Sequence, residues 1–171
     1  LWTNKLGTFE GNSSLATTGT ENSASFYMSG LAYWAAYNGF RTVSGKPMKA
    51  KTYVIDVQEY ADLGKNTQYW FATKYGGADK FNSDGSPYDS TTTDTQFNWW
   101  TNSPQTTGKW PKTLLPAGNP DLMINAVKSA FGSIAAQNAT ASAAALSSGT
   151  LNTNTGLYVY QSSYNSSNWS G

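Results

Sequence analysis

Residues 79–89 concentrate oxygen-bearing side chains around a glycine. The carboxylate and amide members are Asp79, Asn82, Asp84 and Asp89. Calcium prefers oxygen ligands, and a loop of alternating polar side chains bent at a glycine such as Gly85 can supply them. The match to an EF-hand loop is partial, because Lys80 and Thr91 stand where acidic ligands are needed. Two interpretations stay open, a calcium site and an ordinary turn stabilised by Asx side chains.

Three tryptophans form the second candidate site. They are Trp99, Trp100 and Trp110. Exposed tryptophans stack on sugar rings or insert into protein partners, and they lead among interface hot spots. The alternative is a local hydrophobic cluster that holds a long loop in place. The sequence therefore predicts a binding surface here and leaves this structural role open.

Catalytic chemistry has little support in the sequence. Asp56, Glu59 and Asp62 could in principle act as paired acids, but no substrate cleft is indicated near them. Asp56 ends an apolar strand, so it either borders a ligand crevice or caps the next turn. The chain has no cysteine, no histidine, no phosphate-binding loop and no nucleophile elbow. We predict that the protein is not an enzyme.

Composition limits the classes of partner. Charged residues make up only 12% of the chain and the net charge is +1, so nucleic acid and membrane surfaces are not expected as partners. No apolar run approaches the length of a membrane span, and insertion is not expected. With 171 residues and 39% hydrophobic content, the chain can bury one core. It begins at Leu1, without Met or a secretory signal, and we expect a processed product or a piece of a longer protein.

Four segments are predicted to form the regular elements that position these residues. A helix is expected from Ser23 or Ser25 to about residue 38, ended by Gly39, and Leu31 is expected on its core-facing side. Residues 53–57 form an apolar strand covered on both faces. A helix over residues 68–74 is capped by Asn66 or Thr67 and ended by a left-handed Gly76. The remaining helix starts at 119–121, with Asn119 as its cap, and buries one stripe. The stripe consists of Ile124, Val127, Phe131 and Ile134.

The other segments are expected to be irregular. Residues 1–22 are predicted to wrap the surface, residues 41–51 to form a loop and residues 78–118 to form a long insert. Residues 137–155 are typical of a linker, and residues 157–160 form a trailing strand. The fold class expected is α/β, with a first domain at residues 1–137 that contains the insert 78–118. Residues 138–171 would be a linker and the first strand of a following β-domain.

Several motifs together resemble the PilC/PilY family of type IV pilus tip adhesins. The resemblance covers residues 29–171 and depends on the order of the motifs. They are Lys51-Thr-Tyr-Val-Ile-Asp-Val, Gln68-Tyr-Trp-Phe-Ala-Thr-Lys-Tyr-Gly-Gly, Asn82-Ser-Asp-Gly-Ser-Pro, Asn119-Pro-Asp-Leu, Ala130-Phe-Gly-Ser-Ile and Trp169-Ser-Gly. The resemblance implies the closing half of a von Willebrand factor A-like (Rossmann-like) layer that leads into a β-propeller. The adhesion-site motif Asp-x-Ser-x-Ser of A domains is absent, so no family metal site transfers to this chain.

The resemblance also implies a role at the cell surface. An exported protein that passes through the periplasm to the pilus tip would contact minor pilins, a host or abiotic receptor, and the remainder of its own polypeptide. It would support pilus assembly and attachment. Two other functions fit the neutral, aromatic-rich composition: a secreted carbohydrate-binding or surface-layer module, and a structural filament subunit.

Overall fold

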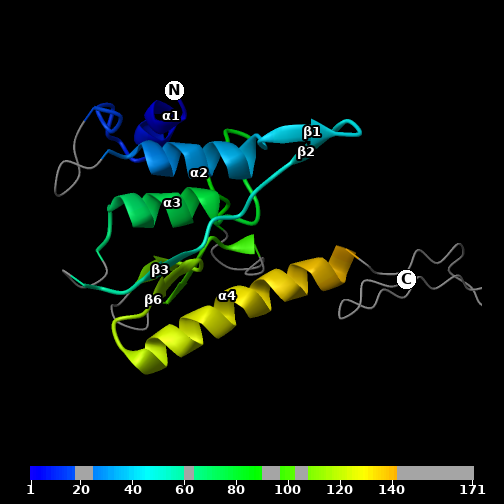
Figure 1. Ribbon diagram of the computed structural model, residues 1–171. Coiled ribbons are helices and arrows are strands. Elements are labelled where there is room, and N and C mark those ends of the chain that lie inside the picture. Colours follow the sequence, from blue (N-terminus) through cyan, green and yellow to red (C-terminus); the bar gives the residue numbers. More distant parts are fainter. Residues whose placement is uncertain (18–24, 60–63, 90–96, 103–107, 142–171) are drawn as a thin grey trace, which may run out of the picture. The chain divides into compact units, whose positions relative to one another are not determined.

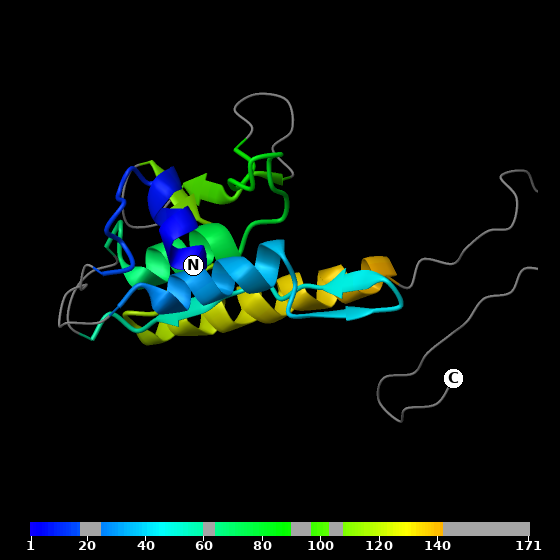
Figure 2. The same cartoon turned by 90° about the horizontal axis from the view of Figure 1, so that it is seen from above.

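The computed structural model describes residues 1–17, 25–59, 64–89, 97–102 and 108–141 (Figures 1 and 2). The chain separates into two compact units, Leu1–Ala130 and Phe131–Gly171. Described helices are α1 (Trp2–Phe9), α2 (Tyr27–Tyr37), α3 (Gln68–Gly76) and α4 (Pro120–Ala141). Described strands are β1 (Arg41–Val43), β2 (Lys46–Met48), β3 (Val54–Asp56), β4 (Trp100–Asn102), β5 (Lys109–Pro111) and β6 (Leu114–Pro116). None of these described helices is both long and apolar enough to cross a membrane.

Helix α1 corrects the expectation that residues 1–22 are irregular. Leu6 on this helix and Leu15 after it are fully buried and belong to the main core. The helix lies against α2 at Gly30, where an added Cβ would sit 2.2 Å from Oγ1 of Thr3. The N-terminal segment is therefore part of the core, and a helix of only two turns was too short to show a sustained period.

Helix α2 confirms the first predicted helix, with two differences. It begins after Phe26 without a side-chain cap, so Ser25 does not cap it, and Ser23 lies outside the described residues. Gly39 has the predicted left-handed conformation, with φ of +85°. Leu31 was expected in the core but is 63% exposed. The buried face of the helix contains Tyr33 and Ala36, and Leu31 lies outside that face.

A β-hairpin replaces the loop expected at residues 41–51. Strands β1 and β2 pair antiparallel, and the turn between them places Ser44 and Gly45 at positive φ. Two successive left-handed residues are the geometry of a tight hairpin turn. All six strand residues are exposed. Because neither face of the hairpin is buried, its residues need not alternate between apolar and polar, and no signal for strands was present in the sequence.

Strand β3 confirms the apolar strand, and its partner lies where an irregular insert was expected. It pairs in parallel with β6, with Ile55 opposite Leu115. Strands β4 and β5 form a separate antiparallel pair within residues 78–118. Each of these strands has three residues, which is too short for a period of two to be recognised. In Figure 1, β3 and β6 lie between α3 and residues 120–130 of α4.

Helix α3 has the predicted start but not the predicted end. Oγ1 of Thr67 accepts a hydrogen bond of 3.1 Å from the Trp70 amide, as expected of an N-cap. The left-handed terminator at Gly76 was wrong, because Gly76 is the last helical residue and Gly77 follows with φ of −101°. The glycines serve close packing instead. A Cβ on Gly77 would lie 2.0 Å from Oγ1 of Thr113, beside β6.

Helix α4 begins as predicted but buries other residues. Oδ1 of Asn119 accepts a hydrogen bond of 2.9 Å from the Leu122 amide. The predicted buried stripe was wrong, because its members are exposed. Within residues 120–130 of this helix, the buried side chains are those of Ala126 and Ala130. The exposed stripe consists of Ile124, Val127, Phe131 and Ile134. The helix also continues to Ala141, into the segment expected to be a linker. The trailing strand at 157–160 lies outside the described residues.

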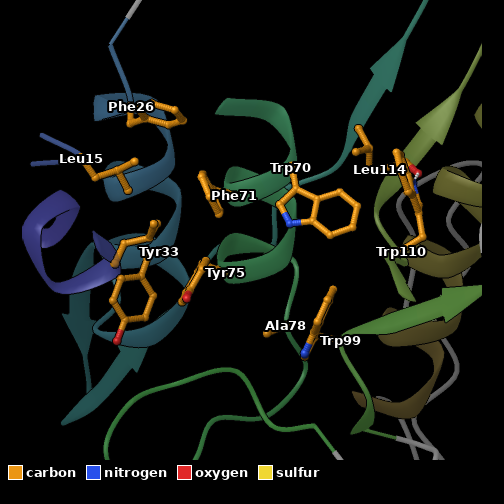
Figure 3. Packing of buried hydrophobic residues seen from close by; sticks show 11 residues of the cluster. Leu15, Phe26, Tyr33, Trp70, Phe71, Tyr75, Ala78, Trp99, Trp110 and Leu114 are labelled. Atoms are coloured by element: carbon orange, nitrogen blue, oxygen red, sulfur yellow. Dashed lines mark hydrogen bonds between the residues drawn. The ribbon is translucent and has the colours of Figure 1, made fainter. Parts of the chain in front are cut away.

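The core is built mainly from aromatic side chains. Figure 3 shows Phe71 and Tyr75 on α3 pointing toward α2, while Trp70 points toward β6 and β5. The rings of Trp70 and Trp110 meet edge to face, with centroids 4.8 Å apart. Pairs of this geometry add to the stability that burial provides. Helix α3 therefore packs against α2 on one side and against β5 and β6 on the other.

Candidate interaction surface

The predicted calcium loop is closed by its own hydrogen bonds. Oδ1 of Asp84 accepts bonds from the amide and the hydroxyl of Ser86, at 2.8 and 2.7 Å. These bonds hold the pKa of the Asp84 carboxyl below its usual range. The carbonyl of Gly85, at φ of +90°, accepts a bond of 2.8 Å from the hydroxyl of the buried Tyr33. The Asn82 amide group donates to the hydroxyl of Ser86 at 2.9 Å. The loop has the geometry of an Asx and glycine turn anchored to α2.

The remaining predicted calcium ligands point to other partners. Asp79 forms an ion pair with Lys51. Asp89 pairs with Lys109 and also accepts a hydrogen bond from the indole of Trp100. Within the described ranges, no three acidic, histidine or cysteine side chains gather closely enough to hold a metal ion. Calcium binding by this loop stays a prediction, and the structure does not bring its four proposed ligands together.

The three tryptophans divide between core and surface. Trp110 is 1% exposed and its indole donates a hydrogen bond of 3.1 Å to the Leu114 carbonyl. Trp99 is 7% exposed and meets Trp70 edge to face. Trp100 is partly exposed, with the ammonium group of Lys109 5.0 Å from its ring centroid. Ligand stacking needs an accessible ring face, so only Trp100 among the three offers part of one.

The carboxylate at the end of β3 caps a turn. Oδ1 of Asp56 accepts a hydrogen bond of 2.9 Å from the amide of Gln58, which has φ of +57°. Oε1 of Gln58 then accepts from the amide of Gly118 at 3.2 Å and so ties the ends of β3 and β6 together. The turn-capping interpretation of Asp56 is confirmed. Glu59 is exposed, and Asp62 lies outside the described residues.

A polar cluster around Glu10 was not found from the sequence. Oε1 of Glu10 contacts Nζ of Lys74 at 2.7 Å and accepts a hydrogen bond of 2.6 Å from the hydroxyl of Tyr75. Burial raises the pKa of the Tyr75 phenol, and the Glu10 carboxylate raises it further. The partners are more than sixty positions apart in the chain, and no local pattern links them. The cluster joins the N-terminal segment to α3.

Several large apolar side chains are exposed on the first unit. Strand β3 was expected to be covered on both faces, but Ile55 is 38% exposed and Val57, directly after it, is 51% exposed. Residues 120–130 of α4 add the exposed side chains of Met123, Ile124 and Val127. Contiguous exposed apolar patches mark interaction sites, whereas apolar residues exposed singly are ordinary. These side chains are the candidate positions for apolar binding on the described part of the first unit.

Comparison with known proteins points in one direction. The chain is similar to a type IV pilus biogenesis factor. The relative is the Type IV pilus biogenesis factor PilY1 homolog of Xylella fastidiosa (strain Temecula1 / ATCC 700964), with 29% identity over 154 residues. The aligned part covers 86% of this chain and 12% of the relative, so the chain spans only a small share of that protein. No family model matches the chain, and no solved structure matches it.

Proposed function

We propose that this chain is part of a surface protein that supports type IV pilus assembly and attachment at the pilus tip. The observation that carries the proposal is the similarity to a pilus biogenesis factor, which extends over 86% of the chain. The proposed location is the outer cell surface, after export through the periplasm. The proposed partners are minor pilins, a host or abiotic receptor, and the remainder of the polypeptide.

The proposed mode of action is binding. Four carboxylates, those of Glu10, Asp79, Asp84 and Asp89, are occupied by hydrogen bonds or ion pairs within the chain. Apolar side chains exposed on the first unit include Ile55 on β3 and Ile124 and Val127 on α4. Apolar side chains of this kind contribute to protein association through burial. We further propose that the α/β layer is of the von Willebrand factor A type, a proposal supported by the parallel strands β3 and β6 between α3 and residues 120–130 of α4.

Gene replacement in the source organism tests this function. A strain that lacks the full-length protein should lose most of its surface pili, counted by electron microscopy, and the intact gene should restore them. A version without residues 1–141 should fail to restore pili although immunoblots show it at normal abundance. Normal piliation in the strain without the protein would refute the proposal.

A further inference from the structure

We propose that the β1–β2 hairpin is a docking arm, and that one of its faces binds an acidic, partly apolar segment of a partner protein. None of the motifs that resemble pilus adhesins falls on the two strands of this hairpin. Binding by the hairpin does not depend on the proposed function of the whole protein, and it can be measured on the 171-residue chain.

Helix α2 holds the base of the hairpin. The amide of Ala50 donates a hydrogen bond of 3.1 Å to the carbonyl of Ala35 on α2. The amide of Phe40 donates one of 2.9 Å to the carbonyl of Met48. An added Cβ on Gly39 would lie 2.8 Å from that same carbonyl oxygen, so the helix end and the hairpin are in close contact. In Figures 1 and 2 the two strands extend beyond the C-terminal end of α2. The hairpin therefore projects from an anchored base, and binding would remove little further conformational freedom.

Burial does not explain why the hairpin is present. All six of its strand residues are exposed, and an isolated two-stranded hairpin is only marginally stable in water. The tight turn also places Ser44 at φ of +50°, a conformation that residues other than glycine adopt infrequently. Surface segments held in a defined shape by a rigid scaffold often carry binding residues. The exposed side chains are therefore the part of the hairpin in which a function is expected.

The pairing register places two cations and two apolar side chains on one face of the hairpin. Arg41 lies opposite Met48, and Val43 lies opposite Lys46. Alternate residues of a strand share one face, and so do residues directly opposite each other. The four side chains therefore form one surface, which we call the cationic face. Each cation on it stands opposite an apolar residue, and Val43 and Met48 are 39% and 42% exposed.

The charges of the cationic face are not compensated by the described part of the chain. Within that part, neither Arg41 nor Lys46 takes part in an ion pair. Lys51, which follows the hairpin, is instead paired with Asp79. The sequence contains no Asp or Glu from residue 22 to residue 55. A complementary partner therefore supplies carboxylates or other anionic groups.

An acidic protein segment fits the cationic face better than other anionic partners do. A polysaccharide has no aliphatic side chains to pack on Val43 and Met48, whereas protein interfaces bury such groups beside charged ones. A hairpin that inserts into a bilayer needs apolar side chains at its tip, but Lys46 occupies one of the two positions next to the turn. An extended peptide with acidic and apolar side chains alternating on one face matches both kinds of residue.

An NMR titration of the 171-residue chain with a synthetic peptide tests the inference. The probe repeats Glu-Thr-Val-Thr three times, so that Glu and Val alternate on one face when the peptide is extended. Amide signals of residues 40–49 should shift, and the affinity should fall at least about tenfold between about 0.05 M and about 0.5 M salt, because salt screens the charges. A peptide that repeats Lys-Thr-Val-Thr should leave the signals unchanged. No shift with the acidic peptide, or equal shifts with both peptides, would overturn the inference.

A third peptide separates a protein segment from other polyanions. Repeats of Glu-Thr-Ser-Thr keep the negative charge and lack the apolar side chains, so they should bind at least about threefold more weakly than the first probe. Equal affinities would show that charge alone suffices, as it would for a polysaccharide or an anionic membrane, and would overturn the assignment to a protein partner.

Substitutions on the two faces of the hairpin locate the binding surface. Reversal of both charges in Arg41→Glu with Lys46→Glu should weaken binding of the first probe at least about tenfold. Thr42→Ala, on the opposite face, is the matched control and should bind as the parent does. All three residues are exposed, so the urea midpoints of the variants should equal that of the parent. Undiminished binding by the charge-reversed chain would overturn the inference. None of these measurements requires pili, so their outcome is independent of the proposed function.

Discussion

Replacing Trp110 by phenylalanine separates a structural tryptophan from a ligand-binding one. The side chain is 1% exposed, donates a hydrogen bond of 3.1 Å to the Leu114 carbonyl and meets the Trp70 ring edge to face. Phenylalanine preserves an aromatic ring for the contact with Trp70 but has no N–H. The substitution therefore leaves a buried carbonyl without a donor and a gap where the larger ring system was.

The magnitude follows from these two losses. An unsatisfied buried acceptor costs about 1–3 kcal/mol. A residual cavity larger than a methyl group adds about 1 kcal/mol. The free energy of unfolding should therefore fall by about 2–4 kcal/mol in Trp110→Phe, with no new contact to offset the loss.

Urea unfolding followed by circular dichroism measures this difference. The matched control is Leu31→Ala, which truncates a large apolar residue that is 63% exposed and should change stability by less than about 0.5 kcal/mol. A loss below about 0.5 kcal/mol for Trp110→Phe would refute the structural role assigned to Trp110. A reduced affinity for glycans with unchanged stability would support the carbohydrate-binding alternative instead.

Three further substitutions test the contacts that hold the fold. Thr67→Ala removes the N-cap bond to the Trp70 amide and should lower the free energy of unfolding by about 1 kcal/mol, whereas Thr67→Ser should retain it. Gly30→Ala places a Cβ 2.7 Å from the backbone nitrogen of Thr3, and a melting temperature equal to that of the parent would contradict the close contact of α1 with α2. Tyr75→Phe tests pH dependence: the folded protein raises the pKa of this phenol above its ordinary value of 10.0, so the unfolded chain ionises first. The stability that depends on neutral Tyr75 is full below pH 10 and is lost as pH rises above it; the parent's urea midpoint should therefore fall more between pH 8 and pH 11 than that of Tyr75→Phe.

Local signals in the sequence were sufficient for four elements. The caps at Thr67 and Asn119 and the left-handed Gly39 depend on neighbouring residues only, and each has the predicted role. The β-branched run at β3 likewise predicted a strand. The partner strand β6 could not be predicted, because three residues show no period and their pairing with β3 is formed across sixty positions of chain.

Burial was harder to predict than secondary structure. The period of α4 groups Ile124 with Val127 on one face, but it cannot say whether another element covers that face. In the described structure the small residues Ala126 and Ala130 are buried instead. The partners of the predicted site residues were equally hard to predict from the sequence. The partners of Asp79 and Asp89 lie 28 and 20 positions away, so loop composition alone suggested a metal site.

Recovery of the full-length protein with sheared pili tests the central claim most directly. Pili released by shearing should contain the protein, detected by an antibody to residues 1–141, at a level well above that in cytosolic fractions. A matched strain without the major pilin should release almost none of it. Equal release from the strain without pilin, or confinement of the protein to the cytosol, would contradict its assignment to the type IV pilus.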